Sequence, residues 1–388
     1  MDGFPLEEIY HKYTSKKVLF TLVILAVSAV ISFGSIFVVR FTGITPDVIW
    51  DVLMTHISGQ GEYPVYYYDL VIWQFYTPRA IMCIFVGAGL AAGGAVMQTL
   101  MRNPLADPYT TGVASGASFG AALCIYLGFS LIPTGNHHLD ITVNAALLAL
   151  VPTAAIIFIS KRKTITPTTM ILAGIAIMYV FRAATSIMTL SADPDSVESL
   201  YMWNVGTVGS ARWDNIWIVA GAVVVSSILL YVLADKVTSM MSGDRIAKSI
   251  GIRTKLVRTV CLLIIALQTA VIVGFTGTIW FMGLVAPHVA RIFVGSNLKY
   301  LIPASMACGA FILVICDCIA KAATFNGLPV GVITSIVGGP VFIILLVKGA
   351  KKVWYRGRSD EERAKALSQN RGMRALVDQP VKGGLRCG

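Results

Sequence analysis

The chain contains 388 residues, of which 56% are hydrophobic and 13% are charged, and its mean hydropathy is +0.74. Because soluble globular proteins carry about 25% charged residues, this composition excludes an ordinary soluble domain and indicates an integral membrane protein. The net charge of +11 does not indicate nucleic-acid binding, since the lysines and arginines fall between apolar runs, where they orient a protein in a bilayer.

The first apolar run covers 18–39 and follows the charged residues 1–17. At about 1.5 Å per residue it can cross the roughly 30 Å hydrocarbon layer, and it is long for the core of a signal peptide. We therefore expect an uncleaved first span, preceded by a cytoplasmic N-terminal segment over 1–17. Later apolar runs predict spans near 78–100, 110–130, 141–160, 166–190, 215–234, 300–321 and 330–348.

Residues 259–290 form an uncharged run that is too long for one span and short for two. Gly274, Gly277, Gly283 and Pro287 lie within it. We expect them to break the run into a seventh span and a short eighth span, which brings the total to about ten.

Basic residues follow the last apolar run, as they precede the first. This pattern places both termini in the cytoplasm. We expect a polytopic transmembrane permease domain over 18–350, followed by a disordered cytoplasmic tail over 351–388.

A basic polar segment, 235–258, separates the sixth and seventh spans. Within it, 242–252 predicts a short helix that Ser242 or Asp244 caps and Gly251 ends. Ile246 and Ile250 would share one face of that helix. A short amphipathic helix on the cytoplasmic side suits docking to another protein.

Two separated stretches carry motifs. The first joins a Gly-rich span to the loop Arg102-Asn103-Pro104-Leu105-Ala106-Asp107-Pro108, and the second contains Gly277-Thr278-Ile279 and Pro287-His288. Small residues four apart let helices approach closely, and the two prolines stop the helices beside the loop.

These stretches resemble the FecCD family, the membrane-spanning subunits of ABC importers for ferric siderophores, haem and cobalamin. The matching motif residues include Arg79, Asn103, Pro104, Pro108, Gly112, Gly116, Gly277, Pro287 and His288.

The resemblance implies an all-α integral membrane protein with the type II ABC importer permease fold. It also implies a homodimer with the translocation path between the protomers, a cytoplasmic ABC ATPase dimer and an extracytoplasmic substrate-binding protein. The family carries its ATPase-coupling helices at about 240–253, and the implied coupling residues are Gly243, Asp244, Ile246, Ala247, Ile250 and Gly251. The chain has no phosphate-binding loop of the type G-x-x-x-x-G-K-S/T, so we expect a transport subunit in the cytoplasmic membrane, neither an enzyme nor a cofactor-binding protein.

Docking of the binding protein is implied at Arg79, Lys321 and Tyr76. In the family, basic residues at these places pair with glutamates of the binding protein; here Tyr76 and Lys321 both stand where the family has arginine. Lysine keeps the charge but loses the bidentate geometry. Alternatively, Asp317 and Lys321, one helical turn apart, neutralise each other.

Arg182 lies inside the predicted fifth span, where a charge costs about 2.5–3.5 kcal/mol unless it meets water or a partner. Either it faces the translocation path and favours an anionic ligand, or it extends to the lipid headgroups. We expect no metal site at His288, because no second metal ligand lies nearby in the sequence.

Within the family, the cargo that we expect first is an iron chelate, a ferric siderophore, moved by alternating access. Cobalamin or another corrinoid, haem and molybdate are alternatives. An ion-coupled secondary transporter is an alternative of another class; it would need an intramembrane carboxylate, for which Asp317 is the candidate.

Overall fold

The computed structural model describes residues 6–39, 43–59, 65–162, 167–324, 327–344 and 347. The chain divides into two units, Met1–Gly338 and Gly339–Gly388. Every site described below lies in the first unit. The predicted tail over 351–388 falls outside the described residues.

The described residues are helical and contain no strand. The longer helices are α1 (Leu6–Ser35), α2 (Pro46–Ser58), α4 (Thr77–Leu100), α5 (Val113–Leu127), α6 (His137–Arg162), α7 (Pro167–Thr189), α8 (Pro194–Val205), α9 (Trp213–Val232), α12 (Thr254–Thr276), α13 (Met282–Val294), α14 (Leu298–Ala323) and a last helix over Val330–Ile344. The shorter elements are α3 (Tyr66–Asp69), the π-helix η1 (Leu70–Tyr76), the 3₁₀ helices η2 (Pro108–Thr111) and η3 (Met240–Ser242), α10 (Ala234–Ser239) and α11 (Asp244–Ser249).

Seven helices in the described part of the chain are long and apolar enough to cross a membrane. Three shorter apolar helices, of 10–17 residues, bring the number of apolar helices there to ten. Each predicted span coincides with one of these helices, which confirms the all-α membrane fold. The second span begins at Tyr66 rather than near residue 78, because the π-helix η1 joins α3 and α4 into one continuous helix.

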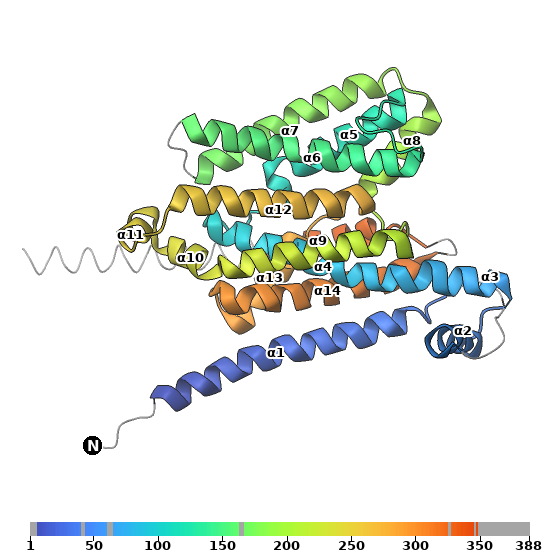
Figure 1. The fold of residues 1–388 in the computed structure, drawn as a ribbon, viewed down its shortest axis with the longest axis horizontal. Helices are drawn as coiled ribbons and strands as arrows, with labels where there is room; N and C mark the ends of the chain where they lie inside the picture. Colours follow the sequence, from blue (N-terminus) through green and yellow to red (C-terminus); the bar gives the residue numbers. More distant parts are fainter. Residues whose placement is uncertain are drawn as a thin grey trace, which may run out of the picture. The chain divides into compact units, whose positions relative to one another are not determined.

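Helix α4 is the most buried of the long apolar helices, and it packs against α9, α12, α13 and α14 (Figure 1). Glycines make this packing possible. A Cβ atom at Gly87 would collide with the backbone of Gly309 in α14, and one at Gly94 would collide with Gly283 in α13. Such close backbone approach drives helix association where lipid offers no hydrophobic force.

The irregular stretch between α12 and α13 is shorter than the sequence suggests. Only 277–281 are irregular, whereas Gly274, Gly283 and Pro287 lie inside helices, which corrects the prediction that they break the run. Pro287 has no N–H to donate to the carbonyl of Gly283, and Nε2 of Gln98 donates to that oxygen at 3.2 Å instead. A partner from α4 therefore allows α13 to keep an internal proline.

The bundle has two ends that matter for function. Helix α4 begins beside Arg79 and ends just before Arg102. We call the end at which α4 begins the Arg79 end, and the opposite end, where α10, η3 and α11 lie, the Asp244 end (Figure 1).

Candidate docking and translocation sites

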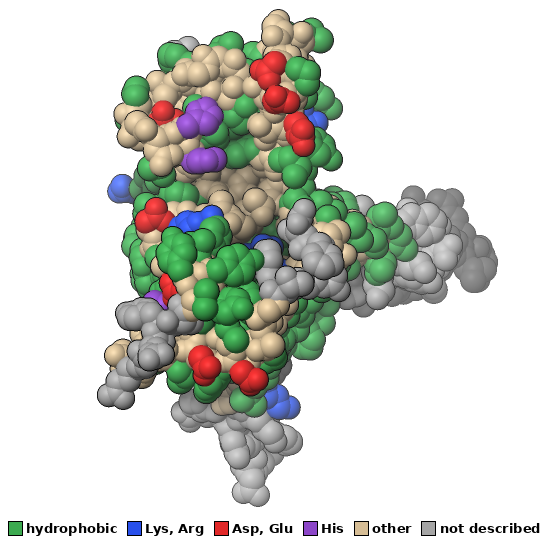
Figure 2. Space-filling model, turned by 90° about the vertical axis from the view of Figure 1, so that its right-hand side faces the viewer, with side chains coloured by type: hydrophobic (Ala, Val, Ile, Leu, Met, Phe, Trp, Pro, Cys, Tyr) green, Lys and Arg blue, Asp and Glu red, His purple; other side chains and the backbone are tan. Residues whose placement is uncertain are grey.

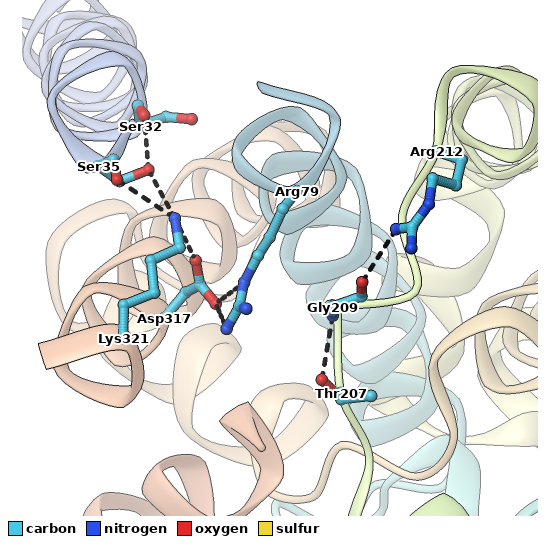
Figure 3. A network of polar contacts seen from close by, with 8 residues as sticks. All are labelled: Ser32, Ser35, Arg79, Thr207, Gly209, Arg212, Asp317 and Lys321. Atoms are coloured by element: carbon cyan, nitrogen blue, oxygen red, sulfur yellow. Dashed lines mark hydrogen bonds and ion pairs between the residues drawn. The ribbon is translucent and has the colours of Figure 1, made fainter. Parts of the chain in front are cut away.

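At the Arg79 end, two cations from different helices hold one buried carboxylate (Figure 3). Nε of Arg79 donates to Oδ1 of Asp317 at 2.8 Å, and Nζ of Lys321 lies 2.9 Å from Oδ2. The side chains of Asp317 and Lys321 are each 1% exposed, and that of Arg79 is 15% exposed. Nζ of Lys321 also donates to the backbone oxygen of Ser35 at 3.3 Å. The cluster therefore links α1, α4 and α14 and keeps one surplus positive charge.

The three predicted docking residues come together here. The ammonium group of Lys321 lies 5.1 Å from the centre of the Tyr76 ring, and both Lys321 and Arg79 pair with Asp317. Lys321 is buried, so its geometry matches the alternative in which it and Asp317 neutralise each other. The docking role of this set stays a prediction, and Arg79 is the cation of the set that solvent reaches.

At the Asp244 end, a second carboxylate lies between two arginines. Asp244 pairs with Arg102, from the loop after α4, and with Nη2 of Arg258 in α12 at 3.1 Å. Arg258 is buried, so without this partner its positive charge would be left uncompensated inside the protein. The prediction that Ser242 or Asp244 caps α11 is wrong. Gly243 is the N-cap residue and no side-chain cap is made, because the carboxylate of Asp244 is engaged by the arginines instead.

The predicted coupling residues divide into two groups around α11. Ile246 and Ile250 are 54% and 62% exposed, while Ala247 is fully buried. Gly243 and Gly251 flank the helix with φ angles of 119° and 85°, which favour glycine. Helix α11 is thus fixed to the bundle by one side, and on the other it exposes isoleucines beside the basic side chains of Arg245 and Lys248. Exposed apolar side chains rimmed by polar ones are typical of a protein contact.

A pocket of about 360 Å³ lies between α5, α7, α8 and the stretch after α12. We call it the Arg182 pocket, because Arg182 is the charged side chain among the described residues that line it. Hydroxyl and amide groups supply much of the remaining lining, including those of Ser115, Ser118, Thr185, Asn204 and Thr278. Arg182 therefore faces a polar cavity within the membrane-spanning part of the chain.

A second pocket, of about 370 Å³, lies at the Arg79 end between the starts of α6 and α9 and the ends of α8 and α12. We call it the Arg212 pocket. The Arg212 guanidinium lies 3.8 Å from the centre of the Phe75 ring, and its Nη1 donates to the backbone oxygens of Gly209 and Ala211 at 3.2 and 2.7 Å. Gly209 lies between Arg212 and the Arg79 cluster (Figure 3). The sequence prediction missed Arg212, although it is the one basic residue in the acidic segment 191–214.

The proline-rich loop motif builds a rigid turn between α4 and α5. Asn103 and Asp107 each accept a hydrogen bond from the backbone N–H two residues further on, at 2.9 Å. Pro104 and Pro108 follow these two residues directly, and Pro108 opens η2. Gly112, with a φ of 86°, joins η2 to α5. The motif residues therefore fix the geometry of the loop.

The other motif residues also serve packing. A Cβ atom at Gly116 would collide with the backbone of Leu148 in α6, and one at Gly277 would collide with the backbone of Trp203. His288 is half-buried in α13. Among the described residues, no group of three or more histidine, cysteine and acidic side chains could hold a metal ion.

Comparison with known proteins adds to this picture. The FecCD transport family matches residues 15–348. A protein of Methanocaldococcus jannaschii that is named as an ABC transporter permease is 36% identical over 351 residues, which cover 89% of this chain and 98% of the relative. An Fe(3+)-citrate import system permease of Bacillus subtilis is 31% identical over 336 residues, which cover 86% of this chain and 96% of the relative.

A solved structure supports the same fold. It is described as an inward-facing conformation of a metal-chelate type ABC transporter, and it matches with a TM-score of 0.68 and 25% identity over 84% of this chain and 99% of that chain. The permease fold is thereby confirmed, and the naming of the relatives as permeases agrees with a transport subunit rather than an enzyme. The match over 15–348 shows that this chain belongs to the FecCD transport family.

Proposed function

We propose that the chain is the permease subunit of an ATP-driven importer that moves an iron chelate, a ferric siderophore, across the cytoplasmic membrane. Membership of the FecCD transport family supports the permease role. The Arg182 pocket is the observation that supports an anionic cargo.

The chemistry of that pocket favours oxygen-rich anions. A guanidinium group binds carboxylates and related oxyanions through two parallel N–H bonds, and no acidic side chain lines the pocket among the described residues. A ferric chelate with peripheral carboxylate or phenolate oxygens supplies the matching charge. Haem propionates and molybdate are also anionic, so the pocket suits these two alternatives as well. It argues mainly against a corrinoid.

The distribution of basic residues supports one orientation. Lysines and arginines crowd the loops of the Asp244 end, which the positive-inside rule assigns to the cytoplasm; they include Arg102, Lys236, Arg245, Lys248, Arg253 and Lys255. The Arg79 end then faces outward. Helix α1 ends beside Lys321 at the Arg79 end, so it begins on the cytoplasmic side.

The partners follow from this orientation. The exposed Ile246 on α11 and Ile250, which directly follows this helix, would contact a cytoplasmic ATPase dimer. Helix α7 is the most exposed of the long apolar helices, and we assign part of its surface, with Arg182, to the contact with a second copy of the chain. The binding protein would dock at the Arg79 end, where the cluster around Asp317 carries surplus positive charge and includes Tyr76.

An ion-coupled secondary transporter is less well supported. Its coupling carboxylate must exchange partners during each cycle, and Asp317 is the candidate. Asp317 is buried and held by both Arg79 and Lys321. This arrangement suits a structural link between helices better than a coupling site.

Variants of Arg182 test the proposed cargo. We would measure uptake of a labelled anionic ferric siderophore and of cobalamin by the complete importer in proteoliposomes. Arg182→Gln is expected to lower uptake of the iron chelate at least tenfold, and Arg182→Lys to retain an intermediate rate, because lysine keeps the charge without the bidentate geometry. Unchanged chelate uptake by Arg182→Gln would mean that Arg182 serves the lipid interface, and efficient cobalamin uptake would assign another cargo.

A further inference from the structure

The Arg212 pocket and the Arg182 pocket share one wall. The wall consists of the end of α8 and the stretch after α12. Trp203 and Gly277 line the Arg212 pocket, whereas Asn204 and Thr278, their neighbours in the chain, line the Arg182 pocket. The two pockets are therefore contacted by adjacent residues of the same two segments.

Short hydrogen bonds tie the two segments of the wall together. The backbone N–H of Thr207 donates to the oxygen of Thr276 at 2.7 Å, and Oγ1 of Thr278 donates to the oxygen of Asn204 at 2.5 Å. Gly277, with a φ of 66°, packs directly against the backbone of Trp203. A displacement of one segment must therefore move the other, and with it the lining of both pockets.

Among the described residues of the Arg79 end, Arg212 is the cation that lacks a carboxylate partner. Arg79 and Lys321 both pair with Asp317, whereas Arg212 forms no ion pair with any described residue. The guanidinium group donates to backbone oxygens through Nη1, and the contact with the Phe75 ring holds its plane in place. The group is thus pre-organised to accept an oxyanion.

The rest of the Arg212 pocket suits a polypeptide partner. Amide and hydroxyl side chains line it, including those of Asn136, Asn215 and Ser210. Figure 2 looks onto the Arg79 end, where histidine side chains lie beside a hollow and acidic side chains gather above it. Asp214 also lines the pocket and is exposed, so it opposes an incoming carboxylate.

We propose that the Arg212 pocket is the socket for an acidic side chain of the extracytoplasmic substrate-binding protein, and that filling it shifts the Arg182 pocket through their shared wall. The proposal rests on the proposed function, because it requires such a partner. It differs from docking at Arg79 and Lys321, because these two cations are engaged inside the chain. It also accounts for the missing arginine at Tyr76, since Arg212 supplies a cation at the same end of the bundle.

The socket is tested by measuring the affinity of the binding protein for the permease–ATPase complex in nanodiscs. Arg212→Gln is expected to weaken binding about tenfold at low salt and to reduce its salt dependence, and Arg212→Lys to restore part of the affinity. Asp214→Asn is expected to strengthen binding about two- to threefold, because it removes the opposing charge. Lys236→Gln, which makes the same change of charge at the Asp244 end, is the control and should bind like the unmodified complex.

Two results would overturn the proposal that the Arg212 pocket receives an acidic side chain of the binding protein. One is unchanged affinity of the Arg212→Gln complex. The other is Arg212-dependent binding of the ferric siderophore alone, which would make the pocket a cargo site. Both results are binding measurements and do not depend on uptake. Failure of the proposed function would instead appear as absence of ATP-driven uptake by the unmodified complex, so the two failures are distinguishable.

The wall is tested by Thr278→Val, which removes the hydroxyl that donates to Asn204 and keeps the side-chain shape. We expect affinity for the binding protein within about twofold of the unmodified complex, with uptake reduced severalfold. Thr278→Ser, which restores the hydroxyl, should recover uptake. Full uptake by Thr278→Val would show that this hydrogen bond does not connect the two pockets.

Discussion

Arg79 and Arg102 stand at opposite ends of α4, and each pairs with a carboxylate that also holds a second cation. Asp317 joins α4 to α14 at one end, and Asp244 joins it to α11 and α12 at the other. Because α4 is the most buried of the long apolar helices, it is placed to relay movements of α11 to the Arg79 end. The predictions below test the two ion clusters, the glycine contacts of α4 and the loop that follows it.

Asp317→Asn should destabilise the protein strongly. The substitution leaves Arg79 and the buried Lys321 without their shared carboxylate, and breaking a buried pair in this way costs about 3–5 kcal/mol. Lys321→Met should cost less, because the pair between Arg79 and Asp317 survives. Thermal unfolding in detergent measures both variants. If Lys321→Met were as damaging as Asp317→Asn, the carboxylate would not be the centre of the cluster.

Asp244→Asn should uncouple ATP hydrolysis from transport. It releases Arg102 and the buried Arg258, so α11 loses its link to α4 and α12. In the reconstituted importer, we expect the amount of cargo moved per ATP hydrolysed to fall severalfold, while Asp244→Glu keeps part of the coupling. An unchanged ratio of transport to hydrolysis in Asp244→Asn would argue against α4 as the relay.

Gly94→Ala should be poorly tolerated, because the new Cβ atom would meet the backbone of Gly283, which cannot move aside cheaply. Overpacking of this kind costs about 1–3 kcal/mol. Gly221→Ala in α9 is the matched control, since nothing lies within 4 Å of its Cβ position, and alanine favours the helix. The melting temperature should fall for the first variant and hold or rise for the second. Equal melting temperatures would contradict the close contact of α4 and α13.

Asp107 should make stability depend on pH. It lies in the loop between α4 and η2, where burial raises the pKa of its carboxyl to about 6. The folded protein then binds this proton more tightly than the unfolded chain, so stability is higher below about pH 4 and falls as the pH rises to about 6. The loss is of the order of 3 kcal/mol.

Asp107→Asn isolates this contribution, because asparagine retains the capping hydrogen bond and cannot ionise. The difference in melting temperature between the variant and the unmodified protein should therefore grow in favour of the variant between pH 4.5 and 7. A difference that stays constant over this interval would show that Asp107 does not titrate there.

Length and charge patterns allowed the ten apolar helices of the described residues to be predicted, because the thickness of a bilayer constrains each segment locally. The uncharged run between Arg79 and Arg102 gave the end of α4 almost directly. Helix α8 was missed, although Asp193 followed by Pro194 is a signal for the start of a helix. In the structure the Asp193 carboxylate accepts a hydrogen bond from the backbone N–H of Ser196 at 2.9 Å.

The polar sites could be predicted only in part. Arg79 and Asp317 lie 238 residues apart, and no local pattern pairs them or buries Lys321. The partners of Asp244 could not be predicted either. Its position at the start of α11 predicted a helix cap, but arginines from two other segments pair with its carboxylate instead. Arg182 stood out because a charge inside a span is costly, but only the fold could place it in a pocket.

The most direct test is uptake of a labelled ferric siderophore by proteoliposomes that contain this chain, its partner ATPase and its binding protein. We predict uptake that requires both ATP and the binding protein. Uptake that persists without ATP and follows an imposed ion gradient would contradict an ATP-driven importer.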